Sequence, residues 1–117
     1  MIDFDYEKAV KTETSRLKSL FKAVPDNKKK LAERLITEAA RLKASLDALW
    51  LDIQENGEYE DFQNGKDVGF ITRERAASKT FTARDKSYQA IMRQLFELLP
   101  PDQGATKSKL DEFIRGS

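Results

Sequence analysis

The sequence predicts an all-α protein, in which a long antiparallel helical hairpin of coiled-coil type carries a short N-terminal helix and a C-terminal tail helix. Two observations predict this fold class. Charged residues make up 35% of the chain while Gly and Pro number only 5 and 3, a composition that suits long, solvent-exposed helices. Two long segments also repeat apolar residues at intervals of three or four. The 117 residues are expected to form one domain, over about 1–100, followed by a tail.

The first two helices are predicted at about 4–24 and 27–55. Pro25 ends the first helix, and Asn56-Gly57 ends the second. Asp26 or Asn27 is expected to cap the second helix, because a short side-chain oxygen can accept hydrogen bonds from its first free backbone N–H groups. The apolar residues of the second helix alternate spacings of four and three, as in a heptad seam: Leu35, Ala39, Leu42, Leu46, Leu49 and Ile53.

A third helix is predicted at about 75–99, where Pro100 and Pro101 end it. Its seam shows the same alternation: Ala77, Phe81, Arg84, Tyr88, Ile91, Leu95 and Leu98. Two amphipathic helices of similar length fold back most simply as an antiparallel pair that buries both seams. Arg84 interrupts the third seam. It either pairs with a facing acid or extends its head group to water, or it specifies the register of a coiled coil.

The connecting segment 56–72 lacks the helical period. Asn64-Gly65 suits a tight type I′ turn between the apolar pairs that flank it, which indicates a short β-hairpin. An irregular loop is the alternative, since two strands alone are marginally stable in water. The sequence leaves both open.

The tail, 101–117, is expected to act separately from the helical domain because it follows two prolines. It contains one short amphipathic segment, which is too short to be stable as an isolated helix and is therefore expected to dock on a partner or on the protein's own helices. The candidate partner contacts are Leu110, Phe113 and Ile114.

The composition argues against an enzyme. The chain has no His and no Cys, which removes the usual proton shuttle, the thiolate nucleophile and the imidazole and sulfur metal ligands. No phosphate-binding loop or dinucleotide turn occurs, and the acidic residues of the segment 58–67 reproduce no calcium loop. We therefore expect neither cofactor nor metal. Without a signal peptide or an apolar run of membrane-spanning length, a cytoplasmic protein without membrane contact is expected.

Charge is segregated although the net charge is only +1. The segment 47–67 is acidic and the segment 73–93 is basic. Such runs are commonly solvated helix faces, but a basic strip can also bind phosphate or an acidic partner. The candidate DNA contacts are Lys28, Lys29, Lys30, Arg34, Arg73, Arg75, Lys79, Arg84 and Lys86. In an antiparallel pair of helices the two groups lie at opposite ends, so an oligomer is needed to merge them.

Three features follow one another along 55–100: Glu55-Asn56-Gly57, the loop Tyr59-Glu60-Asp61-Phe62-Gln63-Asn64-Gly65, and a final helix Tyr88-Gln89-Ala90-Ile91-Met92-Arg93-Gln94-Leu95 closing on Leu98-Leu99-Pro100. In this order of features, the chain resembles small phage proteins classed with the terminase small subunits. The resemblance covers about two fifths of the chain. No helix-turn-helix is recognisable ahead of the long helices, which departs from many members of that family.

The resemblance implies a non-catalytic adaptor for viral DNA packaging. Such an adaptor assembles into a homo-oligomeric ring, binds phage DNA and recruits the large terminase subunit. Because the helix-turn-helix is missing, DNA binding with little or no sequence preference is expected. The alternative is an oligomeric helical protein that serves protein interaction, phage structure or regulation and does not bind DNA.

Overall fold

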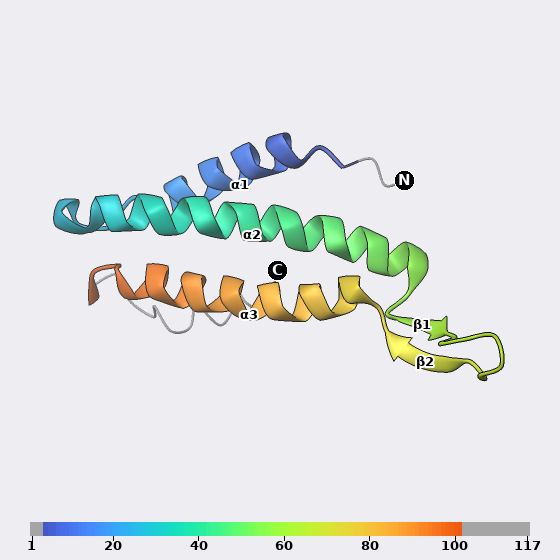
Figure 1. Cartoon of the computed structure of the whole chain (residues 1–117). Helices are drawn as coiled ribbons and strands as arrows, with labels where there is room; N and C mark the ends of the chain where they lie inside the picture. The colour runs from blue at the N-terminus through green and yellow to red at the C-terminus, as the bar shows by residue number, and fades with distance from the viewer. Residues whose placement is uncertain (1–3, 102–117) are drawn as a thin grey trace.

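The computed structural model describes residues 4–101 and is mostly helical (Figure 1). Helices α1 (Tyr6–Leu20), α2 (Lys29–Asn56) and α3 (Ala76–Glu97) pack side by side, and a two-stranded sheet of β1 (Tyr59–Phe62) and β2 (Ile71–Glu74) extends from one end. A short 3₁₀ turn, η1 (Asp26–Lys28), precedes α2. The predicted tail contacts, Leu110, Phe113 and Ile114, lie outside the described residues. Within residues 4–101, no helix has the length and apolar character needed to cross a membrane.

Helix α1 begins at Asp5, whose side chain accepts a hydrogen bond from the backbone N–H of Lys8. It ends at Leu20, four residues earlier than the sequence predicted. Phe21 and Val24 are buried, but they reach the core from a turn rather than from a helix. Phe21 and Val24 continue the helical spacing of apolar residues because they face the core, although the backbone has already left the helical conformation.

The predicted side-chain cap of α2 is wrong. Asp26 and Asn27 belong to η1, and the residue that precedes α2 is Lys28, which makes no side-chain cap. The turn is closed by the backbone, since the N–H of Lys28 donates to the carbonyl of Pro25 at 2.9 Å. The exposed carboxylate of Asp26 instead pairs with Lys29 at 3.2 Å.

Helices α2 and α3 run antiparallel, with Asp52 beside Arg75, Trp50 beside Phe81 and Ser45 beside Arg84. The main core lies toward the other end, where α1 joins them. Its buried residues come from all three helices and the turn after α1: Leu17, Phe21, Val24, Ala32, Leu35, Ile36, Ala39, Leu46, Tyr88, Met92, Leu95 and Phe96. The rings of Phe21 and Phe96 meet edge to face with centroids 5.1 Å apart.

The predicted seam residues fall into two groups. Leu35, Leu46, Ile53, Tyr88 and Leu95 are buried, and Leu42, Leu49, Phe81 and Ile91 are half-buried. Further residues outside the seam are also buried, namely Ala32, Ile36, Ala40, Ala44, Met92 and Phe96. Ile36 and the three alanines belong to α2 and are buried because this helix packs against α1 as well as α3, so its apolar surface is wider than a single seam.

The segment after α2 forms a β-hairpin, which decides between the two alternatives. The strands pair antiparallel with Tyr59 opposite Glu74 and Phe62 opposite Ile71. The predicted tight turn at Asn64-Gly65 is wrong, because residues 63–70 connect the strands. This wider connection is closed by the Gln63 side-chain amide, which donates to the backbone carbonyls of Lys66 and Val68.

Arg75 attaches the hairpin to the end of α2. Its guanidinium donates to both carboxylate oxygens of Asp52 at 3.2 Å and to the carbonyl of Gly57 at 2.8 Å. Its backbone N–H donates to the carbonyl of Glu58. Gly57 has a φ of +84°, a conformation that glycine adopts without steric cost. The base of the hairpin is thus tied to the helices by three separate donors.

Acidification is expected to loosen this attachment. The hydrogen bond from Asn56, followed by Arg75, lowers the pKa of Asp52. Because the folded pKa is below the unfolded value, the contribution of Asp52 to stability is complete above pH about 4 and is lost as pH falls through the folded pKa. The NMR signals of the Arg75 guanidinium should therefore titrate in this acidic range. In Asp52→Asn they should not, and an identical titration in that variant would contradict the assignment.

Candidate nucleic-acid interface

The exposed surface of α3 carries four cations. Lys79, Lys86 and Arg93 are seven residues apart, which places them on one face of the helix at intervals of about 10 Å. Arg84 is also exposed but lies on nearly the opposite side of the helix, next to Ser45 of α2. We refer to Lys79, Lys86 and Arg93 as the α3 basic face. Arg93 is not among the nine candidate contacts named from the sequence, although its seven-residue spacing from Lys86 is a signal that identifies it.

Few acidic residues lie near the α3 basic face. Helix α3 contains only two, Asp85 and Glu97. Asp85 is half-buried toward α2, where its carboxylate accepts a hydrogen bond from Gln89, and Glu97 is the last residue of the helix. Among the described residues, no ion pair involves Lys79, Arg84, Lys86 or Arg93. The face therefore presents positive charge that the described part of the chain leaves without a salt-bridge partner.

Arg84 does not lie inside a coiled-coil interior. Its side chain is exposed, and its guanidinium donates a hydrogen bond to the hydroxyl of Ser45 on α2. Of the alternatives considered from the sequence, extension of the head group toward water is the one that matches this position. The contact links α2 and α3 and leaves the charge of Arg84 on the surface.

Two other candidate contacts serve the hairpin. The Arg73 guanidinium pairs with Glu60 at 2.9 Å and lies 3.6 Å from the centre of the Phe62 ring. Arg75 is engaged by Asp52, as described above. A phosphate would compete with these partners for either guanidinium. Because both guanidiniums already have partners, Arg73 and Arg75 are less available to a phosphate than the residues of the α3 basic face.

The remaining candidates lie where α1 turns into α2. Lys28 and Lys30 are exposed, Lys29 pairs with Asp26, and Arg34 lies 3.5 Å from Glu38. Folding adds two further lysines, because Lys18 and Lys22 line the same shallow pocket as Lys29. The sequence contained no signal for this grouping, which depends on how α1 packs against α2. We call Lys18, Lys22, Lys28, Lys29 and Lys30 the turn lysines.

The two basic surfaces begin at opposite ends of an elongated molecule, measuring 65 × 27 × 22 Å. Lys79 lies near the hairpin, as expected from the antiparallel arrangement. The α3 basic face then continues for about 21 Å to Arg93, three residues before Phe96, which contacts Phe21 at the turn. The α3 basic face therefore extends along the molecule toward the turn lysines and is not confined to one end.

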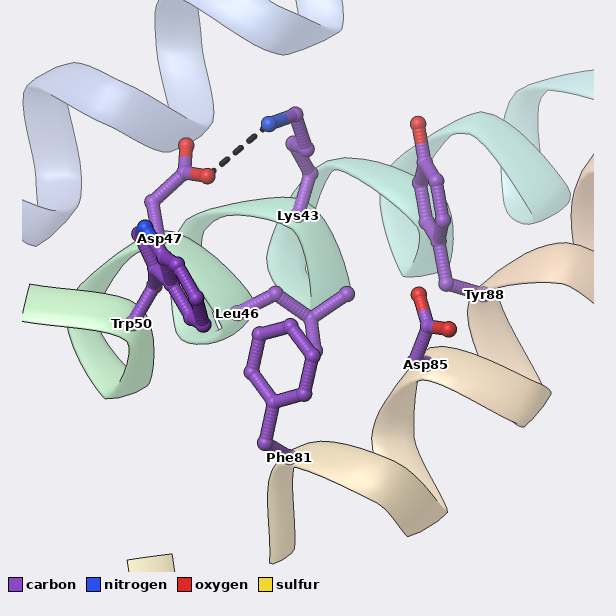
Figure 2. Close-up of a pocket in the computed structure, with 7 residues that line it drawn as sticks. All are labelled: Lys43, Leu46, Asp47, Trp50, Phe81, Asp85 and Tyr88. Atoms are coloured by element: carbon purple, nitrogen blue, oxygen red, sulfur yellow. Dashed lines mark hydrogen bonds and ion pairs between the residues drawn. The ribbon is translucent and has the colours of Figure 1, made fainter. Parts of the chain in front are cut away.

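A pocket of about 370 Å³ opens between α2 and α3 (Figure 2). It is lined by Lys43, Leu46, Asp47 and Trp50 of α2 and by Phe81, Asp85 and Tyr88 of α3. Trp50, which lies beside the seam, is half-exposed here with its ring 5.8 Å from that of Phe81. Lys43 pairs with Asp47 at 2.8 Å. Burial, followed by the Glu13 carboxylate, raises the pKa of Tyr88, so its phenol is neutral at physiological pH.

The pocket does not resemble a metal or acid–base site. Within residues 4–101, no three His, Cys, Asp or Glu side chains are grouped as metal ligands. The pocket carboxylates are already engaged, that of Asp47 by Lys43 and that of Asp85 by Gln89. Its aromatic lining is better suited to packing against an apolar group.

Comparisons with protein-family models, with curated proteins and with solved structures find no match to this chain.

Proposed function

We propose that this protein is a non-catalytic, DNA-binding adaptor that assembles with copies of itself. The α3 basic face is the observation that carries the proposal. Its three cations have no acidic partner among the described residues and are aligned along about 21 Å of helix. Cations that meet the DNA backbone release its condensed counterions, which favours binding without sequence preference. The turn lysines would add contacts once copies are brought together.

The resemblance of 55–100 to small terminase subunits supports a more specific role in viral DNA packaging. In this role the adaptor binds phage DNA in the host cytoplasm and recruits the large terminase subunit. The copies assemble into a ring. The tail residues Leu110, Phe113 and Ile114 contact the large subunit.

A second candidate function is protein interaction without DNA binding. The exposed apolar side chains of the hairpin favour it, because several large apolar side chains left exposed close together in the sequence are typical of a site for protein contact. Such a protein would still form oligomers. The two functions differ in DNA affinity, which makes DNA binding the discriminating measurement.

Binding to duplex DNA is expected to weaken steeply as salt rises. Fluorescence anisotropy of a labelled duplex, titrated with protein at several NaCl concentrations, gives the slope of log K against log salt. Removing two phosphate contacts with Lys79→Gln and Lys86→Gln should make that slope shallower by about 2. Both side chains are exposed, so the fold should be retained.

The matched control removes two exposed lysines of α1, with Lys8→Gln and Lys11→Gln. It has the same net charge as the α3 double variant. The control should keep the wild-type slope, and an equal loss in both variants would point to general charge attraction in place of a defined face. Absence of DNA binding at low salt would reject the DNA-binding function in favour of the second candidate.

A further inference from the structure

The far end of the hairpin exposes three apolar side chains. The exposed fractions are 52% for Val68, 70% for Phe70 and 58% for Ile71. We call these residues the hairpin tip. Exposure of one such residue would be unremarkable, but three within four positions give the tip an apolar surface that loses favourable burial when left in water.

The hairpin tip is held in place by hydrogen bonds. Gln63 closes the loop through two backbone carbonyls, and Arg75 fixes the base of the hairpin to α2. Across the strands, Arg73 pairs with Glu60 and the Thr72 hydroxyl donates to Asp61. Docking of an already ordered segment has a smaller entropic cost than docking of a flexible one. The hairpin tip therefore has the properties of an interaction element.

The pocket between α2 and α3 is suited to receive such a surface. Its apolar lining includes the half-exposed ring of Trp50 and the half-buried ring of Phe81. In Figure 2 these two rings lie together on one side of the pocket, and the carboxylate of Asp85 lies on the other side. A volume of about 370 Å³ is at the lower end of the range for pockets that bind small ligands. It accommodates one aromatic side chain together with an aliphatic one.

The hairpin extends beyond the ends of α2 and α3 (Figure 1), while the pocket lies along their sides. Arg75 holds this arrangement, so the hairpin tip points away from the pocket of its own chain. We propose that the hairpin tip of one copy inserts into the α2–α3 pocket of a second copy. Lys66, which lies in the connection between β1 and β2, would approach Asp85 and add charge complementarity to the apolar contact.

The contact joins two different surfaces, so each copy that donates its hairpin tip still offers an open pocket. Such a head-to-tail interface generates rings when the rotation between copies closes. The inference therefore rests on the self-assembly part of the proposed function and is independent of DNA binding. Two variants test this head-to-tail interface: one that damages only the hairpin tip and one that damages only the pocket.

Phe70→Asp and Trp50→Glu are these two variants. Each should weaken self-association at least tenfold in analytical ultracentrifugation, because each places a charge in the apolar contact. The matched controls are Tyr59→Ser, an exposed aromatic at the base of the hairpin, and Leu51→Glu, an exposed residue beside Trp50 that does not line the pocket. Both controls should associate like the wild type. Circular dichroism checks that all four variants remain folded.

Mixing the two variants provides the decisive test. Phe70→Asp retains an intact pocket and Trp50→Glu retains an intact hairpin tip, so the mixture should form a 1:1 complex that stops at two chains. The chain has a single Trp, so Trp50→Glu has none. Tryptophan emission in the mixture comes only from the pocket of the Phe70→Asp chain, and it should shift to shorter wavelength as the Trp50→Glu chain is added.

Three outcomes would overturn the proposal. The first is unchanged association of folded Phe70→Asp, which would locate the interface elsewhere. The second is a mixture that remains monomeric or grows beyond two chains. The third is wild-type emission that is independent of protein concentration, which would indicate that no second copy covers the pocket. None of these outcomes depends on DNA, so a failed interface and a failed DNA-binding function are distinguishable.

Discussion

Leu95→Asp is expected to abolish cooperative folding. Leu95 is completely buried among residues of α1, α2 and α3, and the substitution removes a large apolar side chain while introducing a charge. Loss of leucine burial and the introduction of an unpaired buried carboxylate together cost about 5 kcal/mol or more. Small domains are stable by only about 5 to 15 kcal/mol, so little or no stability would remain. Circular dichroism at rising temperature should show no sharp transition.

Gln94→Asp is the matched control for this variant. Gln94 is the neighbouring residue of α3 and is exposed, so the same new charge would be hydrated there. The control should melt close to the wild type, since exposed substitutions usually change stability by less than about 0.5 kcal/mol. A Leu95→Asp protein with a wild-type melting curve would contradict the position of α3 in the core.

Leu17→Ala is expected to have the second largest effect and tests whether α1 belongs to the core. Leu17 is completely buried, although the sequence predicted only that it lies in a short N-terminal helix. Truncation of a buried leucine to alanine costs roughly 2 to 5 kcal/mol, through lost burial and the cavity that remains. In a domain of this size, such a loss lowers the melting temperature by about 8 °C or more. Differential scanning calorimetry measures both quantities.

Leu20→Ala, on the same helix, distinguishes loss of packing from a general effect on α1. Leu20 is 40% exposed, and alanine has a slightly higher helix propensity than leucine. This control should lower the melting temperature much less than Leu17→Ala does. If the two variants were equally stable, α1 would not pack against α2 and α3 in solution.

Element type was predictable because local sequence is sufficient to determine it. The periodicity of α2 and α3 and the stops at Gly57 and Pro100 placed the helix boundaries within two residues, apart from the end of α1. That end was misplaced because Phe21 and Val24 are buried at helical spacing within a turn. The hairpin could only be offered as an alternative, since its stability depends on Arg75 reaching Asp52 across 23 positions of sequence.

The residues of the candidate interface were likewise predictable only where local sequence was sufficient. Lys79, Arg84 and Lys86 could be named from charge alone, and the alignment of Lys79 with Lys86 on one side of α3 follows from helical geometry. Charge alone gave no means of separating them from Arg73 and Arg75, whose partners come from the opposite strand and from α2. Lys18 and Lys22 were not found, because their proximity to Lys29 results from packing between helices.

By itself, the sequence determined the helical character, the absence of histidine and cysteine chemistry and the position of the basic segment, because each follows from composition or from spacing within about one helical turn. Only the tertiary structure decided that α2 has two buried faces, that the hairpin tip is exposed and that Trp50 and Phe81 form one pocket. These features depend on contacts between residues far apart in the chain. Such contacts form where total burial is most favourable, and local sequence patterns do not encode which partner fills each surface.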